Sequence, residues 1–473
     1  MGDLLRRHAR RRDIACRSRG RARVMHRLAP SSTASPLRGA RHWIGAGIAG
    51  IALMLARGAA LADTPAIDFT ETERRRILQH SPLPPAPADP TNRVADDPAA
   101  AHFGQYLFFD PRFSANGKVS CATCHDPANG FSDGLPLSNG IATAKRNAPT
   151  LWNVAYNRWY FWDGRADTLW MQALFPMENP AEMGSTRTTI ARAIHADPRL
   201  RSAYESLFGD LPDMSNPARF PPRARPTNEP EHIGENHAWQ AMSPDDREAV
   251  NRVFVNVAKA IAAYERKLIS RNSPFDRFAA GLRESDPTKL AALSPDAQAG
   301  LRLFIGRGKC RFCHSGPNFT DGEFHNVRVP PADGGAPTDP GRYAGIPQLK
   351  ADPFNSRGPY SDAPNGSKAE LLEFLTNNPE NWGAFKTPSL RNVTRTAPYM
   401  HAGQFPSLDR VLHHYSTFDG ALSLGHHAQE TILRPLRLTP QEHRQLRAFL
   451  ESLTDESIDP ALLRAPAAPQ LPR

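Results

Sequence analysis

Two short stretches decide the fold: residues 121–125 read CATCH and residues 310–314 read CRFCH. Both have the spacing C-x-x-C-H. Two thiols one helical turn apart can both add to the vinyl groups of one haem, and the adjacent histidine can then bind the iron. Each stretch therefore predicts one covalently attached haem c. The expected attachment points and iron ligands are Cys121, Cys124 and His125 for the first haem, and Cys310, Cys313 and His314 for the second.

Three other interpretations of these cysteines are open. A zinc site would use both C-x-x-C pairs, but a histidine directly after each pair fits that pattern poorly. A thioredoxin-like redox pair needs a βαβ setting, and neither motif has one. Plain disulfides would form in an oxidising compartment, yet they would not require the histidines. Haem attachment is favoured because it uses every residue of both motifs.

The positive charge of the chain is concentrated in residues 1–62. This segment has 13 Arg and two acidic residues, whereas the rest of the chain has 45 basic and 46 acidic residues. An apolar run at 43–56, followed by Ala60-Leu61-Ala62, completes the pattern of an export signal. The run is shorter than the roughly 20 apolar residues of a membrane-spanning helix. We therefore expect a signal peptide, residues 1–62, cleaved near Ala62, and a periplasmic mature protein with no membrane span and no nucleic-acid partner.

The sequence after each motif repeats at a fixed offset. Residues 149–154 (PTLWNV) match 388–393 (PSLRNV), and each residue lies 239 positions from its counterpart. Tyr160, Gly164, Thr168 and Leu169 match Tyr399, Gly403, Ser407 and Leu408 at the same offset. Both motifs also follow a G-x-x-L-F segment, at 104–108 and 300–304. The repeat predicts two homologous domains: residues 63–285 with the first haem and 286–473 with the second.

The readable secondary structure is helical. Ser243, Ser294 and Thr439 each precede a proline, which is the pattern of an N-cap followed by Pro at the first helical position. Little of the sequence alternates like a strand, and long Pro/Gly-rich loops are expected at 209–242 and 326–365. The predicted fold class is mainly α: two tandem cytochrome c-type haem domains joined and flanked by such loops.

The segment 408–416 (LDRVLHHYS) contains three possible metal ligands in a row. Ser407 is a suitable N-cap, and on the following helix Leu408, Val411, Leu412 and Tyr415 share one face. His413 and His414 point away from that face. Tyr415 is therefore either a core aromatic or, in a haem domain, a residue that faces the second haem.

Position 176 is the counterpart of Tyr415 in the first domain, and it is a proline. If this position lies over the haem in both domains, the second haem meets a phenol and the first meets a residue that cannot bind iron. The repeat thus predicts one open and one closed iron. An open haem iron is a site at which peroxide or dioxygen binds.

Residues 95–455 resemble the bacterial di-haem cytochrome c peroxidase/MauG superfamily. The stretches that carry the resemblance are LFFDPRFSANGKVSCATCHDP, RNAPTLWNV, FWDGRADTLWMQALFPMENPAEMG, CRFCHSGPNFTD and KTPSLRNVTRTAPYMHAGQFPSLDRVLHHY. The resemblance implies a peroxidatic first haem, an electron-transfer second haem and hydrogen peroxide as substrate.

The resemblance also implies roles for individual residues. Gln172 and Glu182 match the polar pair above the peroxidatic haem, where a carboxylate can move a proton between the oxygens of peroxide. Trp162 matches the tryptophan between the haems. Without the motif, Glu182 would be interpreted as a surface residue near a turn and Trp162 as a core aromatic. The family's calcium site is matched by Asn147 and by the backbone carbonyls of Thr396 and Pro398.

Two departures from the peroxidase pattern bear on mechanism. Peroxidases with a resting histidine ligand on the first haem carry it in the loop after C-x-x-C-H, and residues 126–149 contain no histidine. Peroxidases place methionine where Tyr415 stands, and tyrosine there resembles MauG. A thioether stabilises reduced iron, whereas a phenolate stabilises oxidised iron.

The predicted function is that of a di-haem peroxidase-type oxidoreductase that cleaves hydrogen peroxide at an open first haem. Its electrons would come from a small electron-transfer protein, a cytochrome c or a cupredoxin. The first alternative is MauG-like oxidative modification of a protein substrate. A second is a di-haem electron carrier, which would need both irons closed. A haem-based sensor would need an output domain, and the tail after residue 455 shows no sign of one.

Overall fold

The computed structural model describes residues 67–422 and 432–468. All of the described residues belong to one compact unit, Thr64–Arg473. The predicted signal peptide, residues 1–62, lies outside the described residues.

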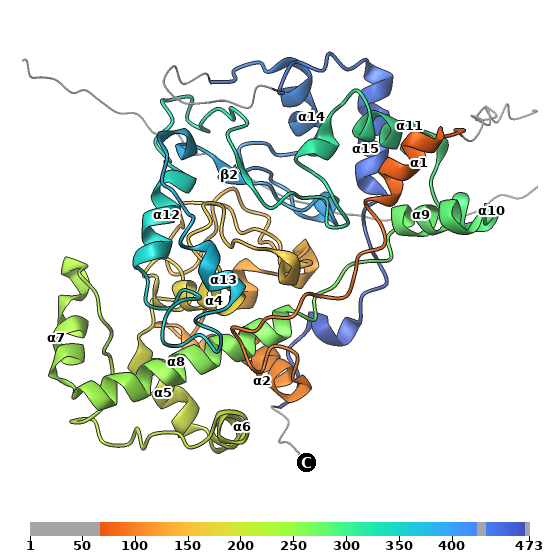
Figure 1. The fold of residues 1–473 in the computed structure, drawn as a ribbon. Helices are drawn as coiled ribbons and strands as arrows, with labels where there is room; N and C mark the ends of the chain where they lie inside the picture. The colour runs from red at the N-terminus through yellow and green to blue at the C-terminus, as the bar shows by residue number, and fades with distance from the viewer. Residues whose placement is uncertain (1–66, 423–431, 469–473) are drawn as a thin grey trace, which may run out of the picture. The chain divides into compact units, whose positions relative to one another are not determined.

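Helices dominate the described part of the chain (Figure 1). The first nine are α1 (Glu71–Leu78), α2 (Pro98–Phe109), α3 (Cys121–Cys124), α4 (Leu169–Glu178), α5 (Arg187–Ala196), α6 (Pro198–Phe208), α7 (Ile233–Ala241), α8 (Pro244–Glu265) and α9 (Pro274–Glu284). They are followed by α10 (Pro287–Leu290), α11 (Pro295–Ile305), α12 (Arg342–Ala351), α13 (Ser367–Leu371), α14 (Leu408–Thr417) and α15 (Pro440–Glu451). Two short strands, β1 (Phe324–His325) and β2 (Phe385–Lys386), pair antiparallel with Phe324 opposite Lys386. The predicted mainly α class is confirmed.

The predicted helix starts are confirmed. The side-chain oxygen of each proposed N-cap accepts a hydrogen bond from the backbone amide three residues later, which satisfies one of the free amides of the first turn. This holds for Ser243 before α8, Ser294 before α11, Ser407 before α14 and Thr439 before α15. None of the helices within 67–422 and 432–468 is both long and apolar enough to cross a bilayer.

The two segments expected to be loops are helical in part. Helix α7 lies within 209–242 and α12 lies within 326–365. Trp239 of α7 is buried, as are Ile346 and Leu349 of α12, although α12 contains Pro347. Burial of these apolar side chains stabilises helices whose local sequence is rich in Gly and Pro, because tertiary packing overrides propensity.

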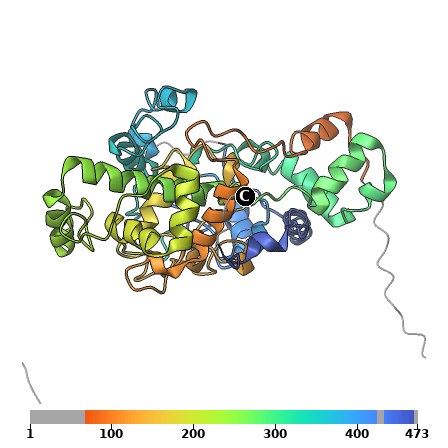
Figure 2. The same ribbon diagram turned by 90° about the horizontal axis from the view of Figure 1, so that it is seen from below.

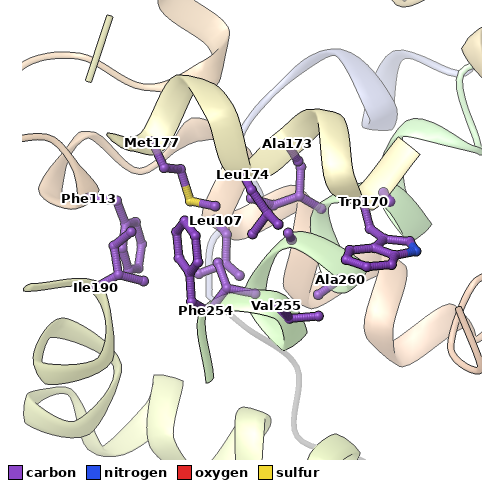
Figure 3. Close-up of a cluster of buried hydrophobic side chains, with 14 of the residues drawn as sticks. Leu107, Phe113, Trp170, Ala173, Leu174, Met177, Ile190, Phe254, Val255 and Ala260 are labelled. Atoms are coloured by element: carbon purple, nitrogen blue, oxygen red, sulfur yellow. The ribbon is translucent and has the colours of Figure 1, made fainter. Parts of the chain in front are cut away.

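The larger hydrophobic cluster forms where α2, α4 and α8 meet. Figure 3 shows Leu107 of α2, Leu174 of α4 and Phe254 of α8 directed toward one another. The second cluster joins α9, α11 and α15, where the rings of Phe304 and Phe449 lie 5.0 Å apart. Helix α1 packs beside α9 and α11 and adds Ile77 to this second cluster (Figure 2).

The two clusters exchange segments of the chain. Leu349, Phe354 and Leu372 come from the predicted C-terminal domain, residues 286–473, but belong to the first cluster. Phe69 and Phe275 come from the predicted N-terminal domain, residues 63–285, but belong to the second. The division into residues 63–285 and 286–473 therefore stays a prediction about the repeat, and the packing does not follow one cut of the chain.

The two G-x-x-L-F segments have the same structural role. A Cβ on Gly104 would lie 1.8 Å from the carbonyl oxygen of Ala260 in α8, and a Cβ on Gly300 would lie 1.9 Å from that of Gln445 in α15. Glycine is required at both positions because α2 crosses α8, and α11 crosses α15, at backbone contact. The crossings place each C-x-x-C-H motif, which follows α2 or α11, at the same place in its domain.

Candidate functional site

A connected cavity of about 1730 Å³ is lined by both C-x-x-C-H motifs. All site residues predicted from the sequence line it. They are Cys121, Cys124, His125, Asn147, Trp162, Gln172, Glu182, Cys310, Cys313, His314, Thr396, Pro398 and Tyr415. The cavity therefore brings together residues that are up to 294 positions apart in the sequence.

The two motif histidines are held in the same way. The Nδ1 atom of His125 donates a hydrogen bond to the carbonyl oxygen of Phe131 at 3.1 Å, and that of His314 donates to Phe319 at 3.0 Å. A donated Nδ1–H leaves Nε2 with a free lone pair, which is the form that binds a metal. The repeated bond fits haem-iron ligation at both motifs.

The cysteines fit attachment better than the alternatives. Cys121, Cys124, Cys310 and Cys313 are free thiols, so the disulfide interpretation does not hold in this structure. Within the described ranges, the one group of three potential metal ligands is Cys313, Asp321 and His325. The two C-x-x-C pairs do not meet there, which argues against a four-cysteine zinc site.

Helices α4 and α14 are counterparts, and residues of both line the cavity together with the two motifs; we call them the covering helices. Each has ten residues, begins after a Thr or Ser N-cap, and starts 239 positions from the other. Pro176 and Tyr415 occupy the eighth position of their helices, and both line the cavity. The structure thus retains the asymmetry that the sequence predicted at this position.

In the part of the cavity beside the first motif, polar side chains lie near Pro176. Gln172 comes from α4, and Glu182 from the turn after it. The Oε1 atom of Glu182 accepts a hydrogen bond from the side-chain amide of Asn179 at 2.6 Å. Burial raises the pKa of Glu182, while the positive charge of Arg165 and the Asn179 bond act in the opposite direction.

The loop after the first motif fixes the turn that carries Glu182. The amide of Ile141 donates to the carbonyl of Glu182 at 2.9 Å, and Ala142 donates to Ala181 at 2.9 Å. A Cβ on Gly140 would lie 2.5 Å from the Glu182 carbonyl oxygen, so the loop approaches the turn at backbone contact.

At the second pocket, Tyr415 lines the cavity, whereas His413 and His414 do not. His414 is nevertheless buried, at 3% exposure, and its Nε2 donates to the carbonyl of Val327 at 3.0 Å. Burial lowers the pKa of His414. Its role is to hold the 326–328 backbone against α14.

Trp162 lines the cavity and forms hydrogen bonds with residues of both repeats. Its indole Nε1–H donates to the carbonyl of Asn147 at 2.9 Å, and its own carbonyl accepts from the amide of Lys386 at 2.8 Å. Trp162 is thus bonded to one residue of each repeat, and its ring is held by the bond to Asn147.

Asn147, Thr396 and Pro398, the residues expected at a calcium site, offer oxygen atoms that suit a hard cation. The Asn147 amide nitrogen donates to the carbonyl of Leu135 at 2.7 Å, which leaves its Oδ1 as an acceptor. In the described part of the chain, no hydrogen bond reaches the carbonyls of Thr396 or Pro398. Oxygen atoms that accept no hydrogen bond from the protein are available as ligands for Ca²⁺.

Arg165, Lys386 and Glu265 are charged cavity residues that are not among the predicted site residues. Arg165 pairs with Asp163 at 3.0 Å and lies 3.5 Å over the Phe161 ring. Burial lowers the pKa of Lys386 to about 8. Arg165 and Lys386 lie inside two of the stretches that carry the family resemblance, but nothing in those stretches singles them out. The third, Glu265 at the end of α8, lies outside every motif, so no local signal marks it.

Comparisons with known proteins agree with this geometry. Residues 98–284 match the family model described as di-haem cytochrome c peroxidase. The chain is 33% identical over 374 residues to methylamine utilization protein MauG of Methylorubrum extorquens, covering 79% of this chain and 82% of that one. It is 33% identical over 364 residues to cytochrome-c peroxidase IdrP2 of Denitromonas iodatirespirans, covering 75% and 82%. The crystal structure of a MauG-like protein associated with microbial copper homeostasis aligns with a TM-score of 0.55 at 26% identity, covering 81% and 98%.

Proposed function

This chain belongs to the di-haem cytochrome c peroxidase/MauG family and is a peroxidase-type oxidoreductase with two c-type haems; on that premise we propose that the first haem site reduces hydrogen peroxide and the second exchanges electrons with it. The observation that carries the proposal is the pocket beside Pro176, where Gln172 and Glu182 line the cavity and position 176 is a proline, which cannot bind iron. His125 and His314 would hold the two irons.

Glu182 is the residue that moves the proton. Bound haem supplies the iron to which peroxide binds and through which electrons reach it. Glu182 would take a proton from one oxygen of peroxide and return it to the other, which leaves as water. Reduction of one peroxide to two waters consumes two electrons and two protons. Because Asn179 bonds Oε1, Oε2 is the atom available for this transfer.

Gln172 and Trp162 support that step. Gln172 carries both a donor and an acceptor and can orient peroxide beside Glu182. Trp162 lies between the repeats and gives electrons a path along the cavity wall from Tyr415 toward Pro176. Tyr415 is the proposed iron ligand of the second site.

The electrons come from a small electron-transfer protein, a cytochrome c or a cupredoxin, or from oxidisable residues of a protein substrate. Tyr415 favours the second source, because a phenolate stabilises the oxidised form of its iron and makes it a poor acceptor from a high-potential donor. Oxidation of purified candidate partners by peroxide in the presence of this protein distinguishes the sources. A di-haem electron carrier would bind neither cyanide nor peroxide.

Glu182→Gln tests the assignment of the proton-moving residue. The variant keeps the hydrogen bond from Asn179 but cannot accept a proton, so peroxide cleavage should slow about 10²-fold or more. Stopped-flow spectra of the holoprotein measure this rate, and haem content should be unchanged. Glu178→Gln is the matched control, because Glu178 pairs with Arg187 and does not line the cavity. A wild-type rate in Glu182→Gln would remove this residue from the mechanism.

We further propose that Asn147, Thr396 and Pro398 bind Ca²⁺ between the repeats. Asn147 donates its backbone amide to the carbonyl of His401 at 2.9 Å, so the proposed ligands lie where the two repeats are already bonded. Removing calcium with a chelator should therefore change the spectra of both haems, and adding Ca²⁺ should restore them. Unchanged spectra in protein shown by metal analysis to lack calcium would contradict this site.

The mature protein is proposed to be periplasmic, with residues 1–62 removed. The Arg-rich start, the apolar run and Ala60-Leu61-Ala62 support this location. N-terminal sequencing of the protein from a periplasmic fraction should begin near Asp63, and a retained leader would refute the cleavage.

A further inference from the structure

Glu265, the last residue of α8, is a buried carboxylate with no assigned role. It is 3% exposed and lines the cavity together with Cys121. Its Oε2 atom is buried and has no hydrogen-bond partner among the described residues. A buried polar atom without a partner is costly and uncommon in a folded protein, so this one calls for an explanation.

Among the residues that the structure describes, no positively charged group pairs with Glu265. The ionisable groups that interact with it are Cys121 of α3, Tyr160 of the turn before α4, and Tyr264 of its own helix. The adjacent Arg266 is engaged elsewhere, with Asp96 at 2.7 Å. Burial raises the pKa of Glu265 to about 8, so the carboxyl can both take up and release a proton near neutral pH. Cys121 would attach the haem through its thiol, and His125 would be the iron ligand of this motif.

The second repeat shows that this carboxylate is specific to the first site. The amide of Asn153 donates to the carbonyl of Leu268 at 2.8 Å, and that of Asn392 donates to Leu453 at 3.1 Å. This sets an offset of 185 between α8 and α15, the same offset as between Ala260 and Gln445 at the two glycine crossings.

At this offset Glu265 corresponds to Leu450. Both residues line the cavity, and Leu450 is also buried. Tyr264 and Phe449, one position earlier, are both fully buried aromatic residues. The fold therefore accepts an apolar side chain at this place, and a carboxyl group is present only at the first site.

We propose that Glu265 is the proton store of the first haem site, taking up a proton when the site gains an electron and releasing it when the site loses one. The proposal rests on the proposed function in assigning electron exchange to this site. An electron from the external donor adds one negative charge to a low-dielectric cavity, and a proton from solvent that converts the Glu265 carboxylate to the acid restores the balance. Oxidation reverses both movements. The store is separate from Glu182, which transfers its proton between the oxygens of peroxide.

The test is a redox titration of the holoprotein at a series of pH values, with each haem followed by its own optical band. Proton uptake on reduction makes the midpoint potential of the first haem fall as pH rises through the range where Glu265 titrates. In Glu265→Gln, which is isosteric and cannot titrate, this fall should disappear. The second haem is the internal control, and its pH dependence should be the same in both proteins. An unchanged pH dependence of the first haem in Glu265→Gln would overturn the proposal.

A second variant and a second readout exclude a purely structural role. Glu265→Leu copies the residue of the second site and should also abolish the pH dependence; retention of it would overturn the proposal even if Glu265→Gln fails to hold haem. Redox-difference infrared spectra should contain a protonated-carboxyl band that both variants lose, and its persistence would count against the assignment. None of these measurements uses peroxide, so a failure here is distinguishable from a failure of the peroxidase assignment.

Discussion

Single residues make the two repeats chemically different. At the eighth position of the covering helix the first repeat has Pro176 and the second has Tyr415. At the end of α8 the first has Glu265, where α15 has Leu450. The first difference places a potential iron ligand at one site only, and the second places a buried acid at the other.

Tyr415→Phe tests the proposed iron ligand of the second haem. Loss of the hydroxyl should leave haem content unchanged but alter the low-spin EPR signal of the second haem, because only an oxygen ligand is removed. Tyr399→Phe is the matched control: Tyr399 lines the same cavity, but its hydroxyl donates to the carbonyl of Val393 at 3.1 Å. If Tyr415→Phe has the wild-type spectrum, Tyr415 is a core aromatic.

The sequence predicted one of these differences and missed the other for a physical reason. Tyr415 and Pro176 lie in segments that keep a 239-residue offset, so their correspondence can be found by counting positions along the sequence. Glu265 and Leu450 are related by an offset of 185, because the connections between the repeated helices differ in length. The backbone bonds of Asn153 and Asn392, together with the two glycine crossings, establish that second register.

Among the elements, the helix crossings are the features that position the motifs. Both G-x-x-L-F segments are visible in the sequence. The reason that they need glycine is not, because it depends on contacts with helices more than 140 residues away. The N-caps, by contrast, depend on neighbouring residues and could be predicted. Helices α7 and α12 could not, because distant apolar contacts stabilise them against an unfavourable local composition.

Gly104→Ala tests the first crossing. The added methyl would lie 1.8 Å from the Ala260 carbonyl oxygen, so α2 and α8 must separate, and the free energy of unfolding should fall by about 1–3 kcal/mol. Thermal unfolding of the holoprotein measures this as a lower Tm. Gly234→Ala in α7 is the control, because nothing lies within 4 Å of its added Cβ, and it should be neutral or stabilising. Equal Tm values for Gly104→Ala and wild type would contradict the crossing.

For the whole molecule, the repeats are joined through exchanged core segments and one common cavity. Segments of each predicted domain complete the hydrophobic cluster of the other. Trp162 forms hydrogen bonds with Asn147 of the first repeat and Lys386 of the second. The sequence predicted two haem domains in tandem but not this exchange, since sequence repeats carry no information on which core a connecting segment enters. The arrangement favours sites that act as a pair.

The most direct test of the central claim is to add stoichiometric hydrogen peroxide to the fully oxidised protein and to follow its optical and EPR spectra. The claim is that Pro176 leaves the first haem open, while Tyr415 lets the second hold an oxidising equivalent. It predicts immediate loss of the ferric signals to a long-lived oxidised species, without prior reduction. No reaction until the protein is half-reduced would mean that another ligand closes the first haem, and would contradict the account.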